Sequence, residues 1–242
     1  PQKEIYEESK HGIAYRDLKD QMNLDAGKWV LGEDYSAAPT CATCHMSATR
    51  NQPITHDPRR RISWNNRPPV SIKLDTDKMH NVVKDGDPEK IDSTWQQKRA
   101  AMTDVCTNCH SPGYVESFYK QYDDFVMLYN TKYGNPGLRL MGALKSNGLI
   151  SKPDFDDKIE WTWFFLWHHE GRRARHGTSM MAPDYAHWHG TYEVADRWYN
   201  EMVPEAREII EHAKEDPAHA AGAAKVEAIL EEILAAPEHK YT

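Results

Sequence analysis

The chain has 242 residues, of which 39% are hydrophobic and 28% are charged, a composition typical of a globular protein with a core of ordinary size. No apolar run approaches the roughly 20 residues that are needed to cross a bilayer, so the sequence predicts no membrane span. The formal net charge of −7, without a basic stripe, argues against a nucleic-acid-binding protein.

Helical periodicity appears only after a first region that is rich in loops. Residues 49–78 contain many prolines and arginines and no sustained period, which predicts an extended loop. Apolar residues then recur at helical spacing over 115–133, 160–169, 194–213 and 225–235. The second of these segments is apolar nearly all round and is predicted to be a buried helix, and the third is expected to kink at Pro204.

All four cysteines lie in two short motifs of the same pattern. The motifs are Cys41-Ala-Thr-Cys44-His45 and Cys106-Thr-Asn-Cys109-His110. A Cys-X-X-Cys-His motif is typical of c-type haem attachment, because the two thiols form thioethers to one porphyrin and the adjacent imidazole reaches its iron. A thioredoxin-like redox pair lacks the βαβ setting that it needs, and a four-cysteine zinc site leaves the repeated histidine unexplained. The sequence therefore predicts two covalently bound c haems, with His45 and His110 as proximal ligands.

Two haems would supply part of the protein core. We therefore expect a mostly α fold, a multihaem cytochrome c with a haem-filled core and long C-terminal helices. Residues 1–113 are predicted to form a dihaem region with loop-rich segments around the haems, and residues 114–242 a helical region. Covalent haem indicates the periplasm or an equivalent extracytoplasmic lumen. The first twelve residues are polar, so we expect that a targeting segment was removed or that the chain begins inside a longer product.

Each iron also needs a sixth ligand or an open face. The candidate distal ligands are His11, His56 and His80. A glycine follows His11 and would let a porphyrin approach the backbone closely, while Asp57 or a nearby carbonyl could orient the ring of His56. The alternative for each is an ordinary surface or core histidine, and the sequence does not pair any of them with a haem. The histidines of the acidic C-terminal segment, His212, His219 and His239, are expected to be solvated.

A second group of candidate residues lies between positions 167 and 192. The possible site-lining residues, as proton carriers or haem ligands, are His168, His169, His176, His187 and His189. Asp184 either holds a Pro-Asp turn that aims Tyr185 or is a plain turn residue, and Tyr185 on its chemistry alone is a packed tyrosine. The arginine runs 59–61 and 172–175 are either solvated surface or partners for haem propionates.

Several of these motifs resemble one known family. The residues that carry the resemblance are PTCATCHM at 39–46, THD at 55–57, WHHEGRRARHG at 167–177 and MMAPDY at 180–185. Together they resemble the C-terminal half of octahaem hydroxylamine oxidoreductase and the closely similar hydrazine dehydrogenases, over essentially the whole chain. The resemblance implies that Tyr185 is covalently bonded to the catalytic haem of a neighbouring subunit, so that three subunits form a covalent homotrimer.

The same resemblance implies the partners of the chain. The catalytic haem would be attached to an N-terminal haem-bearing half or a companion chain, outside this sequence. The substrate would be hydroxylamine or hydrazine, the electron acceptor a soluble cytochrome, and the two haems of this chain electron relays. A tyrosine bridge breaks the conjugation of the macrocycle and favours withdrawal of electrons from a bound nitrogen compound.

Two other functions remain open. A dihaem electron-transfer subunit would have no use for a cross-linked tyrosine, and a nitrite-reducing member of the same superfamily is expected to lack the bridge. The state of Tyr185 therefore separates these alternatives from the oxidising enzyme.

Overall fold

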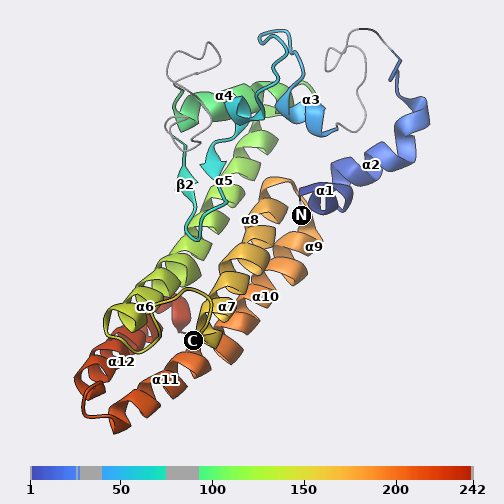
Figure 1. The fold of residues 1–242 in the computed structure, drawn as a ribbon. Helices are drawn as coiled ribbons and strands as arrows, with labels where there is room; N and C mark the ends of the chain where they lie inside the picture. The colour runs from blue at the N-terminus through green and yellow to red at the C-terminus, as the bar shows by residue number, and fades with distance from the viewer. Residues whose placement is uncertain (1, 26, 28–39, 75–92, 241–242) are drawn as a thin grey trace. The chain divides into compact units, whose positions relative to one another are not determined.

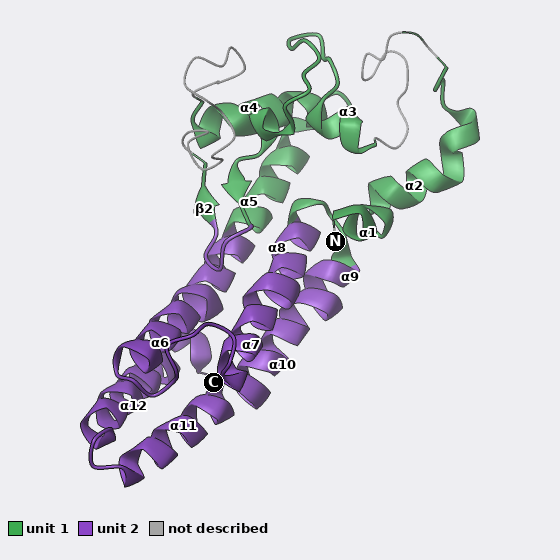
Figure 2. Ribbon diagram, viewed as in Figure 1, with its two compact units in different colours: residues 1–66, 72–123, 179–183 green, residues 67–71, 124–178, 184–242 purple. Residues whose placement is uncertain are grey.

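The chain was analysed as a computed structural model that describes residues 2–25, 27, 40–74 and 93–240 (Figure 1). It divides into two compact units, coloured separately in Figure 2. Unit 1 comprises residues 1–66, 72–123 and 179–183, and unit 2 comprises residues 67–71, 124–178 and 184–242. The functional boundary that the sequence suggests after residue 113 stays a prediction.

Unit 1 consists of short helices and one small β-hairpin. Its helical elements are α1 (Gln2–Glu7), α2 (Lys10–Leu18), η1 (Lys19–Gln21), α3 (Cys41–His45), η2 (Pro58–Arg61), α4 (Trp95–Cys106) and the first part of α5 (Pro112–Tyr129). Strands β1 (Trp64–Asn65) and β2 (Ile72–Lys73) pair antiparallel, with Trp64 opposite Lys73. The side chains of Ser9, Thr40 and Thr94 cap α2, α3 and α4, which satisfies amide groups that a helix start leaves open.

Asp123 connects the hairpin of unit 1 to α4 and α5. Its carboxylate accepts a hydrogen bond from Trp64 Nε1 at 2.7 Å and from Arg99 at 2.6 Å, and Lys73 Nζ lies 3.6 Å away. Burial alone would raise the pKa of Asp123, but the bonds from Arg99 and Trp64 outweigh it and lower the pKa. The charged form of Asp123 therefore stabilises this junction.

Unit 2 is a helical bundle around one apolar core. After the end of α5 its elements are η4 (Asn130–Gly134), α6 (Asn135–Ser146), α7 (Lys158–Phe165), η5 (Leu166–Glu170), α8 (Gly171–Ser179), α9 (Pro183–Ala186), η6 (His187–Tyr192), α10 (Glu193–Arg197), η7 (Trp198–Met202), α11 (Val203–Glu215), α12 (Ala220–Ala235) and η8 (Pro237–His239). Helices α11 and α12 lie side by side (Figure 1). Core residues such as Leu140, Leu144, Trp198 and Val226 are fully buried.

The mostly α fold that the sequence predicts is confirmed. The predicted helix 115–133 continues from α5 through the π-helical turn η4, and the predicted helix 194–213 spans α10, η7 and α11, with Pro204 in the first turn of α11. The predicted segment 160–169 is helical, in α7 and η5, but it is only partly buried: Trp161 is 44% exposed, whereas Trp163 packs in the core. When nearly every position of a helix is apolar, the sequence pattern does not show which side of the helix faces solvent.

His239 is buried rather than solvated, so the sequence-based expectation is wrong. Its Nδ1 atom lies 2.8 Å from the hydroxyl of Tyr199, and its ring stacks on Trp198 with centroids 5.8 Å apart. Burial, followed by the charge of Lys132, lowers the pKa of His239. The charged residues near His239 in the sequence gave no indication of this tertiary contact.

Two glycines of α6 provide a matched test of the packing in unit 2. A Cβ atom at Gly137 would lie 2.0 Å from the ring of Trp163, whereas a Cβ at Gly142 would meet nothing within 4 Å. We expect Gly137→Ala to reduce the free energy of unfolding by about 1–3 kcal/mol through overpacking. Gly142→Ala should instead raise it by up to about 1 kcal/mol, because alanine favours the helix. Urea unfolding followed by circular dichroism measures both, and equal effects would contradict this packing.

Candidate functional site

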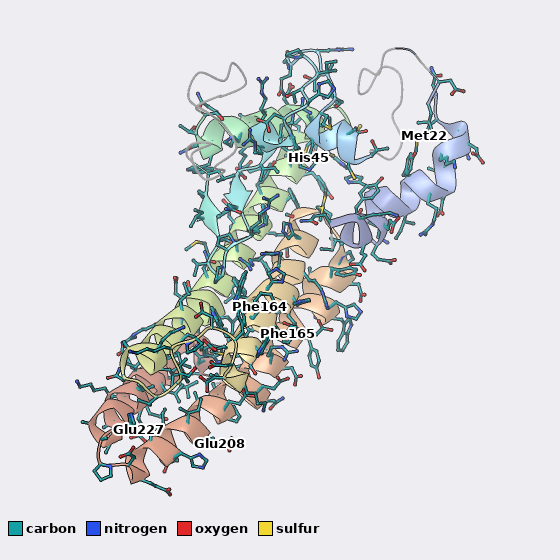
Figure 3. All side chains as sticks on the ribbon, viewed as in Figure 1. Met22, His45, Phe164, Phe165, Glu208 and Glu227 are labelled. Atoms are coloured by element: carbon teal, nitrogen blue, oxygen red, sulfur yellow. The ribbon has the colours of Figure 1, made fainter. Side chains whose placement is uncertain are left out.

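The first Cys-X-X-Cys-His motif forms the short helix α3. Thr40 and Thr43 make a capping box at its start, and Cys41 and Cys44 stand three residues apart, which places both thiols on one face. Cys41 is exposed and Cys44 is half-buried, and Figure 3 labels His45 at the end of this helix. Two reduced thiols on one helical face are suited to bonding one porphyrin.

The second motif begins at the last residue of α4 and forms a tight turn. The amide groups of Cys109 and His110 both donate to the carbonyl of Cys106, at 3.1 and 2.9 Å. Burial, together with the neighbouring Cys106 and Cys41, raises the pKa of Cys44 to about 12. Helices α3 and α4 are in contact, so the two motifs lie close together in unit 1. None of the four cysteines is in a disulfide, and all are available for thioether bonds.

Asp104 ties the two motifs together. Its carboxylate accepts hydrogen bonds from Thr49 Oγ1 at 2.5 Å, Asn51 Nδ2 at 2.5 Å and Gln52 Nε2 at 2.6 Å. Burial works to raise the pKa of Asp104, but these three donors prevail and lower it. The loop after the first motif is thereby held on the helix that carries the second.

Arg61 supports the first motif from inside the unit and is not solvated. It is 3% exposed and donates to the carbonyl of Cys44 at 3.0 Å and to that of Ser47 at 2.6 Å. A guanidinium on these carbonyls complements the negative end of α3. Arg59 instead pairs with Asp57 at 2.8 Å.

His45, the predicted proximal ligand, is half-buried at the end of α3. Burial lowers its pKa, and the backbone of Pro58 works in the opposite direction. Its Nδ1 atom is buried and has no hydrogen-bond partner among the described residues.

The rings of His11 and His110 face each other across a gap in unit 1. Their centroids are 6.0 Å apart with an interplanar angle of 50°. The centre of an imidazole lies about 3 Å from a metal to which it is bound by a nitrogen at about 2 Å, so two axial imidazoles on one metal have centres about 6 Å apart. The spacing of the two rings is therefore compatible with an iron that has both as ligands.

The structure places the other distal candidates differently. His56 is exposed, and the carboxylate of Asp57, which was expected to orient it, is bonded to Arg59. His80 lies outside the described residues. A Cβ at Gly12 would lie 1.9 Å from the carbonyl of Tyr6, so this glycine lets α2 approach the end of α1; its role in porphyrin approach stays a prediction.

Tyr114 is a residue that sequence analysis missed. Its ring stacks on His110 with centroids 4.7 Å apart and an interplanar angle of 22°. The available signal was an aromatic residue four positions after the motif histidine, at the spacing of one helical turn. The stack fixes the plane of the His110 imidazole.

Tyr185 lies on the short helix α9 in closely packed surroundings. The turn before it is at Met180–Ala182, where Met181 has a φ of 58°, and not at Pro183-Asp184 as expected, because Pro183 opens the helix. A Cβ atom at Gly177 would lie 2.9 Å from the Cβ of Tyr185, and one at Gly190 would lie 2.2 Å from its carbonyl. Both glycines thus let α8 and η6 approach α9, which holds the half-buried Tyr185 in place.

The five predicted site-lining histidines fall into separate groups. The ring centroid of His189 is 5.7 Å from that of Tyr185, and its nitrogens lie 3.6 Å from Asp184 and 3.0 Å from Glu193. His187 is exposed beside Trp188. The remaining three are His168 and His169, which pack on Phe164 and Phe165, and His176 on α8.

The helical fold and the two attachment motifs define a multihaem c-type cytochrome. A profile of the family described as "Seven times multi-haem cytochrome CxxCH" matches residues 2–152. The chain belongs to this family. Over 136 residues it is 26% identical to a probable nitrite reductase-hydroxylamine oxidoreductase fusion protein of Kuenenia stuttgartiensis, an alignment that covers 52% of this chain and 16% of that relative.

Solved structures share the fold. A hypothetical multiheme protein has a TM-score of 0.64 at 20% identity, covering 86% of this chain and 53% of the other. The reducing HAO-like protein complex of Kuenenia stuttgartiensis has a TM-score of 0.62 at 18% identity, covering 96% and 54%. The resemblance to the hydroxylamine oxidoreductase family is confirmed, and the chain spans about half the length of these structures. Within the described residues, no helix has the length and apolar character of a membrane span.

The Asp104 junction gives a stability test. Asp104→Asn replaces a carboxylate, which only accepts hydrogen bonds, by an amide that also donates them. We therefore expect the free energy of unfolding to fall by about 1–3 kcal/mol at neutral pH. Because the pKa of Asp104 is lowered in the folded state, its contribution is complete above the unfolded pKa of about 3.9 and fades as the pH falls through the folded value. Urea unfolding at neutral pH and near pH 3 measures this difference.

The exposed Glu116 on α5 is the control for Asp104. Glu116→Gln should change stability by less than about 0.5 kcal/mol at either pH. A variant of Asp104 that behaves like the Glu116 variant would show that the junction does not hold the two motifs together.

Proposed function

We propose that this chain is the relay half of a periplasmic multihaem c-type oxidoreductase that oxidises hydroxylamine or hydrazine. The observation that carries the proposal is the spacing of His11 and His110, whose ring centroids are 6.0 Å apart. A bound c haem supplies one-electron redox chemistry at its iron. Two imidazoles at this spacing leave no face of the iron for a substrate, so this site transfers electrons and does no bond chemistry.

The residues of unit 1 support such a relay in three ways. Tyr114 fixes the plane of His110, Arg61 supports the carbonyl end of α3, and Asp104 holds the two attachment motifs together. Rigid ligands limit rearrangement when an iron changes its charge. Two attachment sites held close in one unit are what electron transfer between them requires.

Tyr185 is the residue that we propose for the covalent link to the catalytic haem of a neighbouring subunit in a homotrimer. Its helix is fixed by the close approaches at Gly177 and Gly190. His189, placed between Asp184 and Glu193, is the nearest candidate for a proton carrier beside the phenol. The same segment exposes Trp188 at 56% and Tyr192 at 57%, a surface with the aromatic character of protein interfaces.

The catalytic haem and the substrate pocket belong, in this proposal, to an N-terminal half or a companion chain. The chain covers only 16% of the Kuenenia fusion protein and corresponds to about half of the similar solved structures, which is consistent with a missing haem-bearing part. A soluble cytochrome would accept the electrons.

A reductive function in the same superfamily is the second candidate. It is favoured by the names of two similar proteins, a probable nitrite reductase-hydroxylamine oxidoreductase fusion and a reducing HAO-like complex. A reductase would need the same relay but no tyrosine bridge, so the two candidates share the role of His11 and differ at Tyr185.

Replacement of His11 tests the relay. In His11→Ala we expect one haem of this chain to change from low-spin to high-spin, because the iron loses a strong-field nitrogen ligand. Electron paramagnetic resonance of the oxidised protein measures the change. The exposed His212 on α11 provides the control, and His212→Ala should leave the spectrum unaltered; an unaltered spectrum in the His11 variant as well would exclude the pairing.

Replacement of Tyr185 tests the cross-link. Tyr185→Phe removes the phenol oxygen and should abolish any covalent oligomer on a haem-stained denaturing gel, while Tyr192→Phe in the same segment should retain it. Intact mass gives the same information independently. If the covalent oligomer survives in Tyr185→Phe, Tyr185 is not the bridging residue. If the unmodified protein runs as a single chain, the oxidising function is rejected in favour of the reductive one.

A further inference from the structure

A cluster of cationic side chains lies in unit 2 and has no role in the proposed relay or cross-link. Its members come from the loop 67–71, η5 and α8 and are Arg67, His168, Arg172, Arg175 and His176. We refer to these five residues as the cationic cluster. The guanidinium of Arg172 lies at its centre, 3.0 Å from Nε2 of His168 and 2.6 Å from the carbonyl of Arg67.

Arg175 fixes the loop against α8. It is fully buried and donates to the carbonyls of Pro68 at 3.0 Å and Gly171 at 2.8 Å, and to Ser71 Oγ at 2.8 Å. Its guanidinium also lies 4.1 Å from the ring centroid of Tyr129. These hydrogen bonds hold the cluster in a defined shape, and they go to uncharged acceptors.

The nearby carboxylates are bound to other arginines. Glu170 pairs with Arg197 at 3.0 Å, and Glu193 pairs with Arg173 at 3.1 Å. Burial, together with the charges of Arg175, Arg172 and Arg67, lowers the pKa of His176 to about 4. Burial and the three arginines therefore both disfavour the charged form of this ring.

His168 carries its ring proton on the nitrogen opposite to the one that meets Arg172. Arginine can only donate, so Nε2 of His168 must accept the bond from Arg172, and the proton of the ring is on Nδ1. This Nδ1 atom and the Nε of Arg172 are buried, and neither has a hydrogen-bond partner in the described part of the chain. Buried donors without an acceptor are costly and indicate a missing ligand.

The wall beside these donors is flat and aromatic. The ring of His168 stacks on Phe164 with centroids 4.4 Å apart and an interplanar angle of 17°, and Phe164 projects from α7 (Figure 3). Guanidinium donors next to a flat wall match a planar anion, because arginine binds carboxylate-like groups through parallel hydrogen bonds.

We propose that the cationic cluster binds a planar oxyanion of the carboxylate class through Arg172 and Arg67, beside the ring of His168. The oxyanion has two possible sources: the propionate of a haem that is attached outside this chain, or a small free anion. The proposal goes beyond the relay and the cross-link and does not depend on either.

The test compares two neighbouring arginines of α8 in the intact, haem-loaded protein. Arg172→Gln removes the central donor of the cluster, whereas Arg173→Gln removes a charge that pairs with Glu193. Arg67→Gln, at an exposed position, is the second test variant if Arg172→Gln does not fold. Thermal unfolding is measured during a titration with potassium formate, a planar carboxylate, and the midpoint potentials of the haems are measured by potentiometric titration.

Either of two results would support the site, and they distinguish a free anion from a haem propionate as its ligand. If formate stabilises the unmodified protein and Arg173→Gln, and binds about tenfold or more weakly to Arg172→Gln and Arg67→Gln, the site takes a free oxyanion. If formate has no effect but one haem has a lower midpoint potential in the same two variants only, the ligand is a propionate. If the test variants match Arg173→Gln in both measurements, the proposal is overturned. That result would not bear on the covalent oligomer, which the Tyr185→Phe variant tests separately.

Discussion

The account depends on one pair of imidazole rings. His11 and His110 are almost a hundred positions apart in the sequence, yet their ring centroids are 6.0 Å apart, which is the spacing that one iron imposes on two axial ligands. In the proposed function this pair binds one iron. An iron with nitrogen ligands on both faces would exchange electrons, and bond chemistry would take place at another haem.

Polar contacts, rather than a large apolar core, organise the surroundings of the two attachment motifs. Asp104 gathers three donors from one loop, Asp123 joins the hairpin to two helices, and Arg61 is buried against the carbonyls of the first motif. Buried polar groups stabilise a structure only when they are fully bonded.

The sequence could predict the features that local chemistry determines. The two motifs indicate c-type haem, the helical spacing indicates the mostly α fold, and the resemblance leads to the family that the comparison of residues 2–152 supports. The sequence could not predict contacts made by distant residues. His239 looks solvated among charged neighbours but packs on Trp198, and Arg175 belongs to an arginine run that looks like surface but is fully buried. In both cases a tertiary partner outweighs the local polarity of the chain.

The most direct measurement is an anomalous difference map at the iron absorption edge from crystals of the haem-loaded protein. The account predicts an iron atom between His11 and His110, about 2 Å from one nitrogen of each ring, with its porphyrin bonded to Cys106 and Cys109. An iron bound by His110 with water, another residue or nothing on its opposite face, and with His11 distant from it, would contradict the account.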